Sequence, residues 1–277
     1  MERVTIFGIG ASVFTLLLVC GLFLLLLLAY LGLGLVGRRP RSAEMAARGE
    51  TVLLPLFVRE YWDWVISPVT ALLIRLKVNP NLITWASFFV AAGAGVALAY
   101  GYFGLGGWLY IFAGTCDMFD GKVARATGSA SKTGAFIDST LDRYTEIFVM
   151  SGLAYFFKDS LVLWAALGGL AGSLMVSYTR ARGEGLGYSY REGGMQRAER
   201  IVYLGLAGVF GKVAEALVPP RKWSVSFMAF GVILVAVSSN ITALQRFFGI
   251  VRALKARDEN EKDCLVVKHP GARKLKV

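Results

Sequence analysis

The chain has 277 residues, of which 56% are hydrophobic, and its mean hydropathy is +0.57. This composition excludes an ordinary soluble domain and predicts an integral membrane protein. The formal net charge of +11 indicates basic loops that contact anionic lipids, so we expect no nucleic-acid partner. The three cysteines, at positions 20, 116 and 264, form no disulfide framework.

The first predicted element is a transmembrane helix within residues 5–36, where the chain carries no charge. This stretch is long enough to cross a bilayer. A signal peptide is the alternative, but its apolar part is shorter, about 7–15 residues. Arg38, Arg39 and Arg41 follow directly, as in a stop-transfer signal. We therefore predict an uncleaved anchor over residues 1–36.

Residues 37–78 form the next predicted segment, a cytoplasmic linker followed by a helix. Tyr61, Trp62 and Trp64 are interleaved with charged residues, a pattern typical of a helix that lies in the membrane interface. The alternative is a solvated linker that ends in the next membrane span. We favour the interfacial helix.

Six apolar segments then predict a six-helix core over residues 79–244. The predicted spans are 82–102, 108–126, 135–157, 160–179, 201–218 and 223–243. The charged residues 245–277 are expected to form a basic cytoplasmic tail. The predicted fold class is all-α: a polytopic membrane helix bundle with an extra N-terminal transmembrane helix and an interfacial helix.

The distribution of lysine and arginine among the loops predicts the orientation in the membrane. One set of loops is rich in basic residues and lies on the same side as the basic tail. The basic residues of these loops are Arg38, Arg39, Arg41, Arg48, Lys122, Arg125, Lys132, Arg180, Arg182, Arg191, Arg197 and Arg200. The opposite set holds only Lys158, Arg221 and Lys222. The richer side should face the cytoplasm of a cell (inner) membrane, with the N-terminus outside.

Four carboxylates lie between long apolar runs, at Asp117, Asp120, Asp138 and Asp142. Spacings of three and four residues place each pair on one helix face. Carboxylates at membrane depth are costly unless a cation or a partner neutralises them. Two facing helices would bring all four to one site. Oxygen ligands favour Mg²⁺ or Mn²⁺, and no His or Cys is placed to build a zinc site.

Two glycines and an arginine accompany these carboxylates. Gly121 and Gly134 have no side chain, so a backbone or a phosphate can approach closely. Arg125 follows Gly121 by four residues, on the same helix face, and can pair with a phosphate. The combination predicts a pyrophosphate site.

Together these residues fit D-x2-D-G-x2-A-R-x8-G-x3-D-x3-D, which resembles the signature of the CDP-alcohol phosphotransferase family. All eight fixed positions are filled, by Asp117, Asp120, Gly121, Ala124, Arg125, Gly134, Asp138 and Asp142. The alternative is two polar helix ends with solvated acids. The resemblance extends over residues 79–243 and leaves out the first helix and the tail.

The resemblance implies a transferase that moves the phosphatidyl group of CDP-diacylglycerol to a hydroxyl acceptor and releases CMP. It implies that the four aspartates hold Mg²⁺ or Mn²⁺ and that Asp142 is the general base. The implied contacts of the CDP-lipid are Pro80, Asn81, Leu82, Ile83, Gly121, Arg125 and Ser131. Family members are usually homodimers, so a homodimer is expected.

A second basic stretch lies between Arg180 and Arg200. By itself it could equally be a positive-inside loop without a ligand. It is similar, however, to the S-Y-x-K-A-R-x-E and E-R-x-E-R segments of bacterial phosphatidylinositol phosphate synthases. That similarity implies inositol phosphate as the acceptor, held by Arg180, Arg182, Arg197 and Arg200. Arg180 replaces a lysine of the pattern, and Gln196 replaces a glutamate.

Three other functions stay open. The same chemistry could use glycerol phosphate or another alcohol or polyol as the acceptor. A cation transporter could use intramembrane carboxylates, although transport gives the glycines and Arg125 no role. A catalytically silent membrane scaffold would not need the intact motif.

Overall fold

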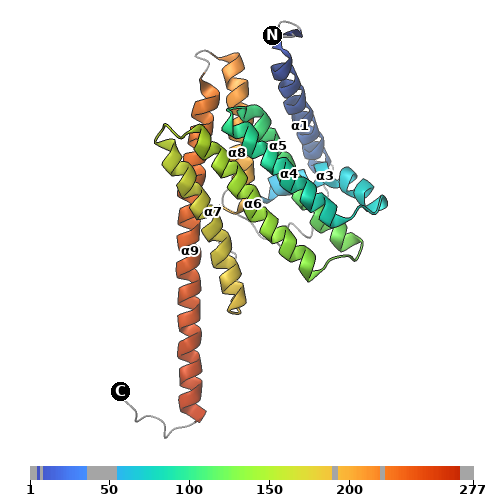
Figure 1. The fold of residues 1–277 in the computed structure, drawn as a ribbon. Coiled ribbons are helices and arrows are strands. Elements are labelled where there is room, and N and C mark those ends of the chain that lie inside the picture. The colour runs from blue at the N-terminus through green and yellow to red at the C-terminus, as the bar shows by residue number, and fades with distance from the viewer. Residues whose placement is uncertain (1–4, 7–8, 36–54, 189–192, 219–221, 269–277) are drawn as a thin grey trace.

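The computed structural model describes residues 5–6, 9–35, 55–188, 193–218 and 222–268. These residues form a short antiparallel hairpin, β1 (Thr5–Ile6) with β2 (Ile9–Gly10), and eight helices. The helices are α1 (Ala11–Leu35), α3 (Leu56–Arg75), α4 (Pro80–Ala99), α5 (Phe103–Ala126), α6 (Lys132–Phe156), α7 (Val162–Gly185), α8 (Arg197–Leu217) and α9 (Trp223–Lys268). The predicted all-α bundle is confirmed (Figure 1).

The six predicted core spans fall on α4 to α9. Helix α4 packs against α5 and α6, α8 packs against α5 and α9, and α7 lies along α9 (Figure 1). The last predicted span ends at residue 243, whereas the helix that contains it, α9, continues to Lys268. Charged residues end the apolar run there, but Lys, Arg and Glu are good helix formers and do not end the helix.

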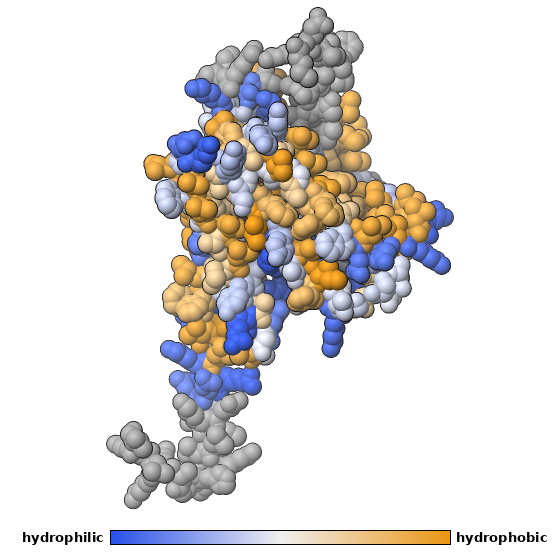
Figure 2. All heavy atoms as spheres, viewed as in Figure 1, coloured by the Kyte–Doolittle hydropathy of each residue, from blue (hydrophilic) through white to orange (hydrophobic). Residues whose placement is uncertain are grey.

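Within the part of the chain that the structure describes, three helical segments are long and apolar enough to cross a membrane: Pro80–Ala99, Val162–Gly185 and Trp223–Glu259. Gly21–Leu35 is a shorter apolar helical segment. In Figure 2, apolar side chains cover the middle of the visible face, whereas hydrophilic ones gather toward its upper and lower ends and its right edge. This distribution fits a bundle whose middle contacts lipid.

Helices α1 and α3 pack together beside the core. The hydroxyl of Tyr61 on α3 donates a hydrogen bond to the carbonyl of Phe23 on α1, at 2.7 Å. Tyr30 on α1 is fully buried. Its ring lies 5.4 Å from that of Trp64 and 5.7 Å from that of Phe57.

Some of the predicted segments lie outside the described residues. These are the linker over residues 37–54, the end of the tail, and the basic residues Arg38, Arg39, Arg41, Arg48, Arg191 and Arg221.

Helices α4 and α6 each begin at a side chain that caps the helix. The Asn79 side chain accepts a hydrogen bond from the Asn81 N–H at 3.0 Å, and Pro80 opens α4. The hydroxyl oxygen of Ser131 accepts from the Gly134 N–H at 3.0 Å at the start of α6. These caps fix where the predicted lipid-site residues stand relative to the helix axes.

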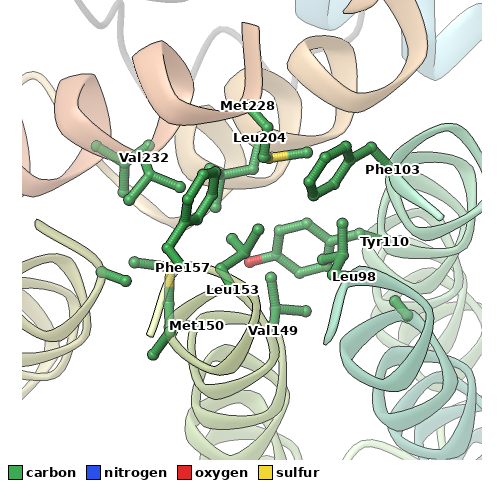
Figure 3. Close-up of a cluster of buried hydrophobic side chains, with 14 of the residues drawn as sticks. Leu98, Phe103, Tyr110, Val149, Met150, Leu153, Phe157, Leu204, Met228 and Val232 are labelled. Carbon is green, nitrogen blue, oxygen red and sulfur yellow. The ribbon is translucent and has the colours of Figure 1, made fainter. Parts of the chain in front are cut away.

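The largest apolar cluster lies where α4 ends, α5 begins and α6 ends. It includes Leu98, Phe103, Leu153 and Phe157, with Met228 from α9 (Figure 3). The α4 and α6 backbones touch at two glycines of these same helices: a Cβ on Gly152 would lie 2.8 Å from the carbonyl carbon of Gly95. Small residues allow such close approach between membrane helices.

Candidate active site

Three carboxylates from α5 and α6 converge at one end of the bundle. Asp117, Asp120 and Asp138 each offer one oxygen, and these three oxygens lie within 4.8 Å of one another. Asp120 is buried, and Asp117 and Asp138 are half-buried. The turn between the two helices brings the pairs together, since α5 ends at Ala126 and α6 starts at Lys132.

The chemistry of this cluster fits a divalent cation. Among the described residues, no hydrogen-bond partner reaches the buried Oδ1 atoms of Asp117 and Asp138. Buried polar atoms are usually paired, and neighbouring carboxylates repel one another unless a positive charge lies between them. An all-oxygen donor set suits a hard cation such as Mg²⁺ or Mn²⁺.

Asp142 lies beside the cluster and pairs with an arginine. Nη2 of Arg197 lies 2.8 Å from Asp142 Oδ1, and Nη1 of the same guanidinium lies 2.6 Å from Asp117 Oδ2. Arg197 is the first residue of α8. The guanidinium therefore bridges a carboxylate of the cluster and the predicted general base.

Thr84 is a site residue that sequence reasoning missed. Its hydroxyl donates a hydrogen bond to Asp120 Oδ2 at 2.7 Å, and both residues are buried. The hydroxyl also contacts the carbonyl of Pro80 at 3.1 Å, one turn earlier in α4. The sequence held a signal for Thr84: the spacing of the Asn-Pro-Asn-x-x-Thr segment places the threonine one turn inside the helix.

The predicted CDP-lipid residues fall into two contact groups. A Cβ on Gly121 would lie 3.2 Å from Nη1 of Arg125, so the guanidinium packs over the glycine as the spacing predicts. A Cβ on Gly134 would lie 3.2 Å from Ser131 Oγ and 3.6 Å from Asn81 Oδ1. At the start of α4, Pro80 is half-buried, Leu82 is exposed and Ile83 is buried.

The four arginines predicted to bind the acceptor have different environments. Arg197 contacts the carboxylates, as above. Arg180 pairs with Glu184 at 3.0 Å on the surface of α7, and Arg182 is exposed. The side chain of Arg200 is 2% exposed and forms an ion pair with Glu146. A ligand would reach the Arg200 guanidinium only if this pair opened.

Two further residues have structural roles that the sequence analysis did not assign. Glu146 lies one helical turn after Asp142 and is the buried partner of Arg200. Glu199 forms a capping box with Gln196 at the start of α8: its Oε2 accepts from the Gln196 N–H at 3.1 Å. The Gln196 side chain caps α8 in return, so this glutamine acts as the N-terminal cap at a position where the resemblance pattern has glutamate.

Comparisons with known proteins place these features in a family. Residues 77–251 match the family model described as CDP-alcohol phosphatidyltransferase. A phosphatidylinositol phosphate synthase of Cutibacterium acnes is 30% identical, over 72% of this chain and 98% of its own length. A phosphatidylinositol phosphate synthase of Streptomyces avermitilis is 35% identical, over 72% of this chain and 83% of its own length.

Solved structures of Mycobacterium tuberculosis phosphatidylinositol phosphate synthase are also similar. The structure with CDP-DAG bound has a TM-score of 0.59 and 26% identity, over 67% of this chain and 93% of that one. The complex with manganese and citrate has the same TM-score and identity, over 66% of this chain and 87% of that one. Helix α3, residues 56–75, lies outside the segment that the family model matches. The chain belongs to the CDP-alcohol phosphatidyltransferase family and is a membrane enzyme.

Proposed function

We propose that this protein transfers the phosphatidyl group of CDP-diacylglycerol to inositol phosphate and releases CMP. One observation carries the proposal: Asp117, Asp120 and Asp138 converge within a complete family motif, in a chain at least 30% identical to two phosphatidylinositol phosphate synthases. The relative of known structure binds CDP-DAG, which supports the same lipid donor here.

Asp117, Asp120 and Asp138 would hold Mg²⁺ or Mn²⁺, and Asp142 would complete the site at its edge. When bound, the cation neutralises the pyrophosphate and stabilises the charge that develops on CMP. The hydrogen bond from Thr84 keeps Asp120 turned toward the other two carboxylates. The buried Oδ1 atoms of Asp117 and Asp138 have no hydrogen-bond partner among the described residues and are available to the cation.

The CDP-lipid would lie across the starts of α4 and α6 and the end of α5. Its proposed contacts there are Pro80, Asn81, Leu82, Ile83, Gly121, Arg125 and Ser131. Arg125 packs against Gly121, so its guanidinium stands next to a position of α5 that has no side chain of its own and can bind a phosphate there. The exposed Leu82 is suited to the acyl chains, because its side chain faces outward from the bundle.

Asp142 would take the proton of the acceptor hydroxyl as that hydroxyl attacks phosphorus. Arg197 contacts Asp142 directly, so an acceptor phosphate held by this guanidinium would bring its hydroxyl close to the base. Arg180 and Arg182, at the exposed end of α7, would add positive charge for the same phosphate. Arg200 would contribute only after separation from Glu146.

The site would face the cytoplasm of a cell (inner) membrane, where soluble inositol phosphate and CMP exchange freely. The lysine and arginine counts of the loops support this orientation. We further propose a homodimer, as the family resemblance implies. Chemical cross-linking in native membranes would test the dimer, and cysteine labelling from either side would test the orientation.

The decisive experiment follows CMP release by purified protein with CDP-diacylglycerol and Mg²⁺ or Mn²⁺. Inositol phosphate, free inositol, glycerol phosphate and buffer are compared, and the lipid product is identified by mass spectrometry. We expect CMP and phosphatidylinositol phosphate only with inositol phosphate, and neither after removal of the cation with EDTA. CMP release with glycerol phosphate and none with inositol phosphate would show that the acceptor is wrong.

A specific observation favours a second candidate for the acceptor. Arg180 stands where the resemblance pattern has lysine, and it is paired with Glu184 rather than turned to the carboxylates. A different polyol phosphate could therefore be preferred, with the same donor and the same release of CMP. The panel of acceptors above distinguishes these cases by the mass of the lipid product. Cation uptake into liposomes without CMP release would instead indicate a transporter.

A further inference from the structure

Helix α3 lies outside the family-matched segment, yet two ion pairs tie it to the site. Arg59 and Asp63 are four residues apart and share one face of α3. Nη2 of Arg59 lies 2.6 Å from Glu199 Oε1 at the start of α8. Asp63 pairs with Lys122, the residue that follows Gly121 in α5.

The Arg59 pair acts on the first turn of α8. The Glu199 side chain is fully buried, and its second oxygen accepts from the backbone N–H of Gln196. One carboxylate therefore serves both the α8 cap and Arg59. Two residues earlier, Arg197 extends to Asp117 and Asp142. Loss of Arg59 would remove a cation from a buried carboxylate, which is costly, and would loosen the turn that carries Arg197.

The Asp63 pair acts on the motif helix α5. Lys122 directs its ammonium toward α3, because it is paired with Asp63. Apolar side chains reinforce this contact: Ile66 and Trp62 of α3 belong to one cluster with Phe119 and Val123 of α5. Helix α3 thereby fixes the turn of α5 that contains Asp120 and Gly121.

Helix α1 holds α3 in place from another side. The Phe23 ring stacks on Trp62 of α3 at 5.4 Å and lies 6.1 Å from Trp108 of α5. The hydrogen bond from Tyr61 to the Phe23 carbonyl adds a polar contact. Helix α3 is thus packed against both α1 and α5, which limits its freedom to slide.

We propose that Arg59 and Asp63 are positioning residues that act on different substrates. Arg59 positions Arg197 through Glu199 and thereby sets the affinity for the acceptor phosphate. Asp63 positions the Gly121 turn through Lys122 and thereby sets the affinity for the CDP-lipid. The assignment of each substrate to its side rests on the proposed function, whereas the mechanical link between α3 and the two turns does not.

The kinetic test compares Arg59→Gln and Asp63→Asn with Arg75→Gln, an exposed residue at the end of the same helix. A misplaced binding group commonly costs one to two powers of ten, so we expect an increase of about tenfold in the relevant KM. Arg59→Gln should raise the KM for inositol phosphate only, and Asp63→Asn the KM for CDP-diacylglycerol only. Arg75→Gln should match the unaltered protein.

Two rescue variants separate positioning from folding. Arg59→Lys keeps the positive charge opposite Glu199 and should restore most of the acceptor KM. The exchange Asp63→Lys with Lys122→Asp reverses the ion pair and should restore the KM for the CDP-lipid. An equal rise of both KM values in each single variant, or failure of both rescues, would overturn the proposal.

Hydrogen–deuterium exchange tests the mechanical link without any substrate. Arg59→Gln should speed amide exchange in residues 196–200 and leave residues 119–126 unchanged, and Asp63→Asn should do the reverse. Uniform exchange changes in both variants, or none, would overturn the link even if the enzyme were fully active. An unaltered protein that releases no CMP would instead contradict the proposed function, while the exchange pattern still decides the link.

Discussion

The two ends of the helix bundle are built on different principles, although the same helices run through both. At the apolar end, Leu98 and Leu153 are buried, and the α4 and α6 backbones touch at Gly95 and Gly152. At the acidic end, Thr84, Asp117, Asp120, Asp138 and Asp142 come together with Arg197. The apolar end is held together by packed apolar side chains and close helix contact. The acidic end keeps carboxylate oxygens without a partner among the described residues.

This difference separates stability from function within one bundle. Close packing at the apolar end contributes to stability, because removed or added methyl groups leave cavities or strain. Carboxylate oxygens without a partner at the acidic end lower stability and are retained where a ligand compensates them. Substitutions at the acidic end should therefore abolish activity without unfolding the protein. Substitutions at the apolar end should lower stability and leave the activity of the folded protein near normal.

The largest expected effect is at the acidic end, in Asp120→Asn. Removing one cation ligand should lower the rate of CMP release by about 10³-fold or more. The thermal unfolding midpoint should stay the same or rise, because repulsion among the carboxylates decreases. Asp159→Asn, at an exposed aspartate beyond the end of α6, is the matched control and should leave both quantities unchanged. Mn²⁺ binding, measured by electron paramagnetic resonance, should weaken in Asp120→Asn alone. An unchanged rate of CMP release in Asp120→Asn would contradict the cation site.

The second effect concerns the buried ion pair between the two ends. Arg200→Met leaves Glu146 buried without its cation and should lower the free energy of unfolding by about 3–5 kcal/mol. The double variant Arg200→Met with Glu146→Leu should recover much of that loss, since no buried charge is left alone. Reversible unfolding in mixed micelles measures both. Equal losses in the single and double variants would show that the pair contributes nothing through charge.

A smaller effect is expected at the apolar end, in Gly152→Ala. The added methyl group would meet the backbone of Gly95, so α4 and α6 must separate, at a cost of about 1–3 kcal/mol. Gly168→Ala in α7 is the matched control, because a Cβ there meets nothing within 4 Å. CMP release per folded molecule should stay near normal in both variants. A loss of activity in Gly152→Ala at unchanged stability would break the separation between the two ends.

The smallest effect is expected for the exposed Arg182. Arg182→Gln should change the free energy of unfolding by less than about 0.5 kcal/mol, as is usual for surface residues. It should raise the KM for inositol phosphate a few-fold, because one positive charge near the acceptor phosphate is lost. Arg252→Gln, an exposed arginine of α9, is the matched control for charge. A KM that moves equally in both variants would indicate general electrostatic attraction.

Spacing along the chain was sufficient to predict much of this protein. The intervals between Asp117 and Asp120, and between Gly121 and Arg125, fix faces of a single helix, and the structure has these side chains where the intervals place them. The positions of the core helices followed from apolar run lengths, and the start of α4 from Asn79 and Pro80. Such features depend on local geometry, which neighbouring residues determine.

Contacts between distant segments were decided only by the tertiary structure. Arg197 reaches Asp117 across 80 residues of sequence, and Arg59 reaches Glu199 across 140. Basic residues in loops pair with whichever carboxylate the packing of helices brings near, so their counts predict orientation but not partners. Hydropathy likewise marked where the apolar run of α9 ends, and it could not mark where the helix ends, because charged residues propagate a helix in water. Local spacing thus determined the motif, and helix packing determined which charges meet in it.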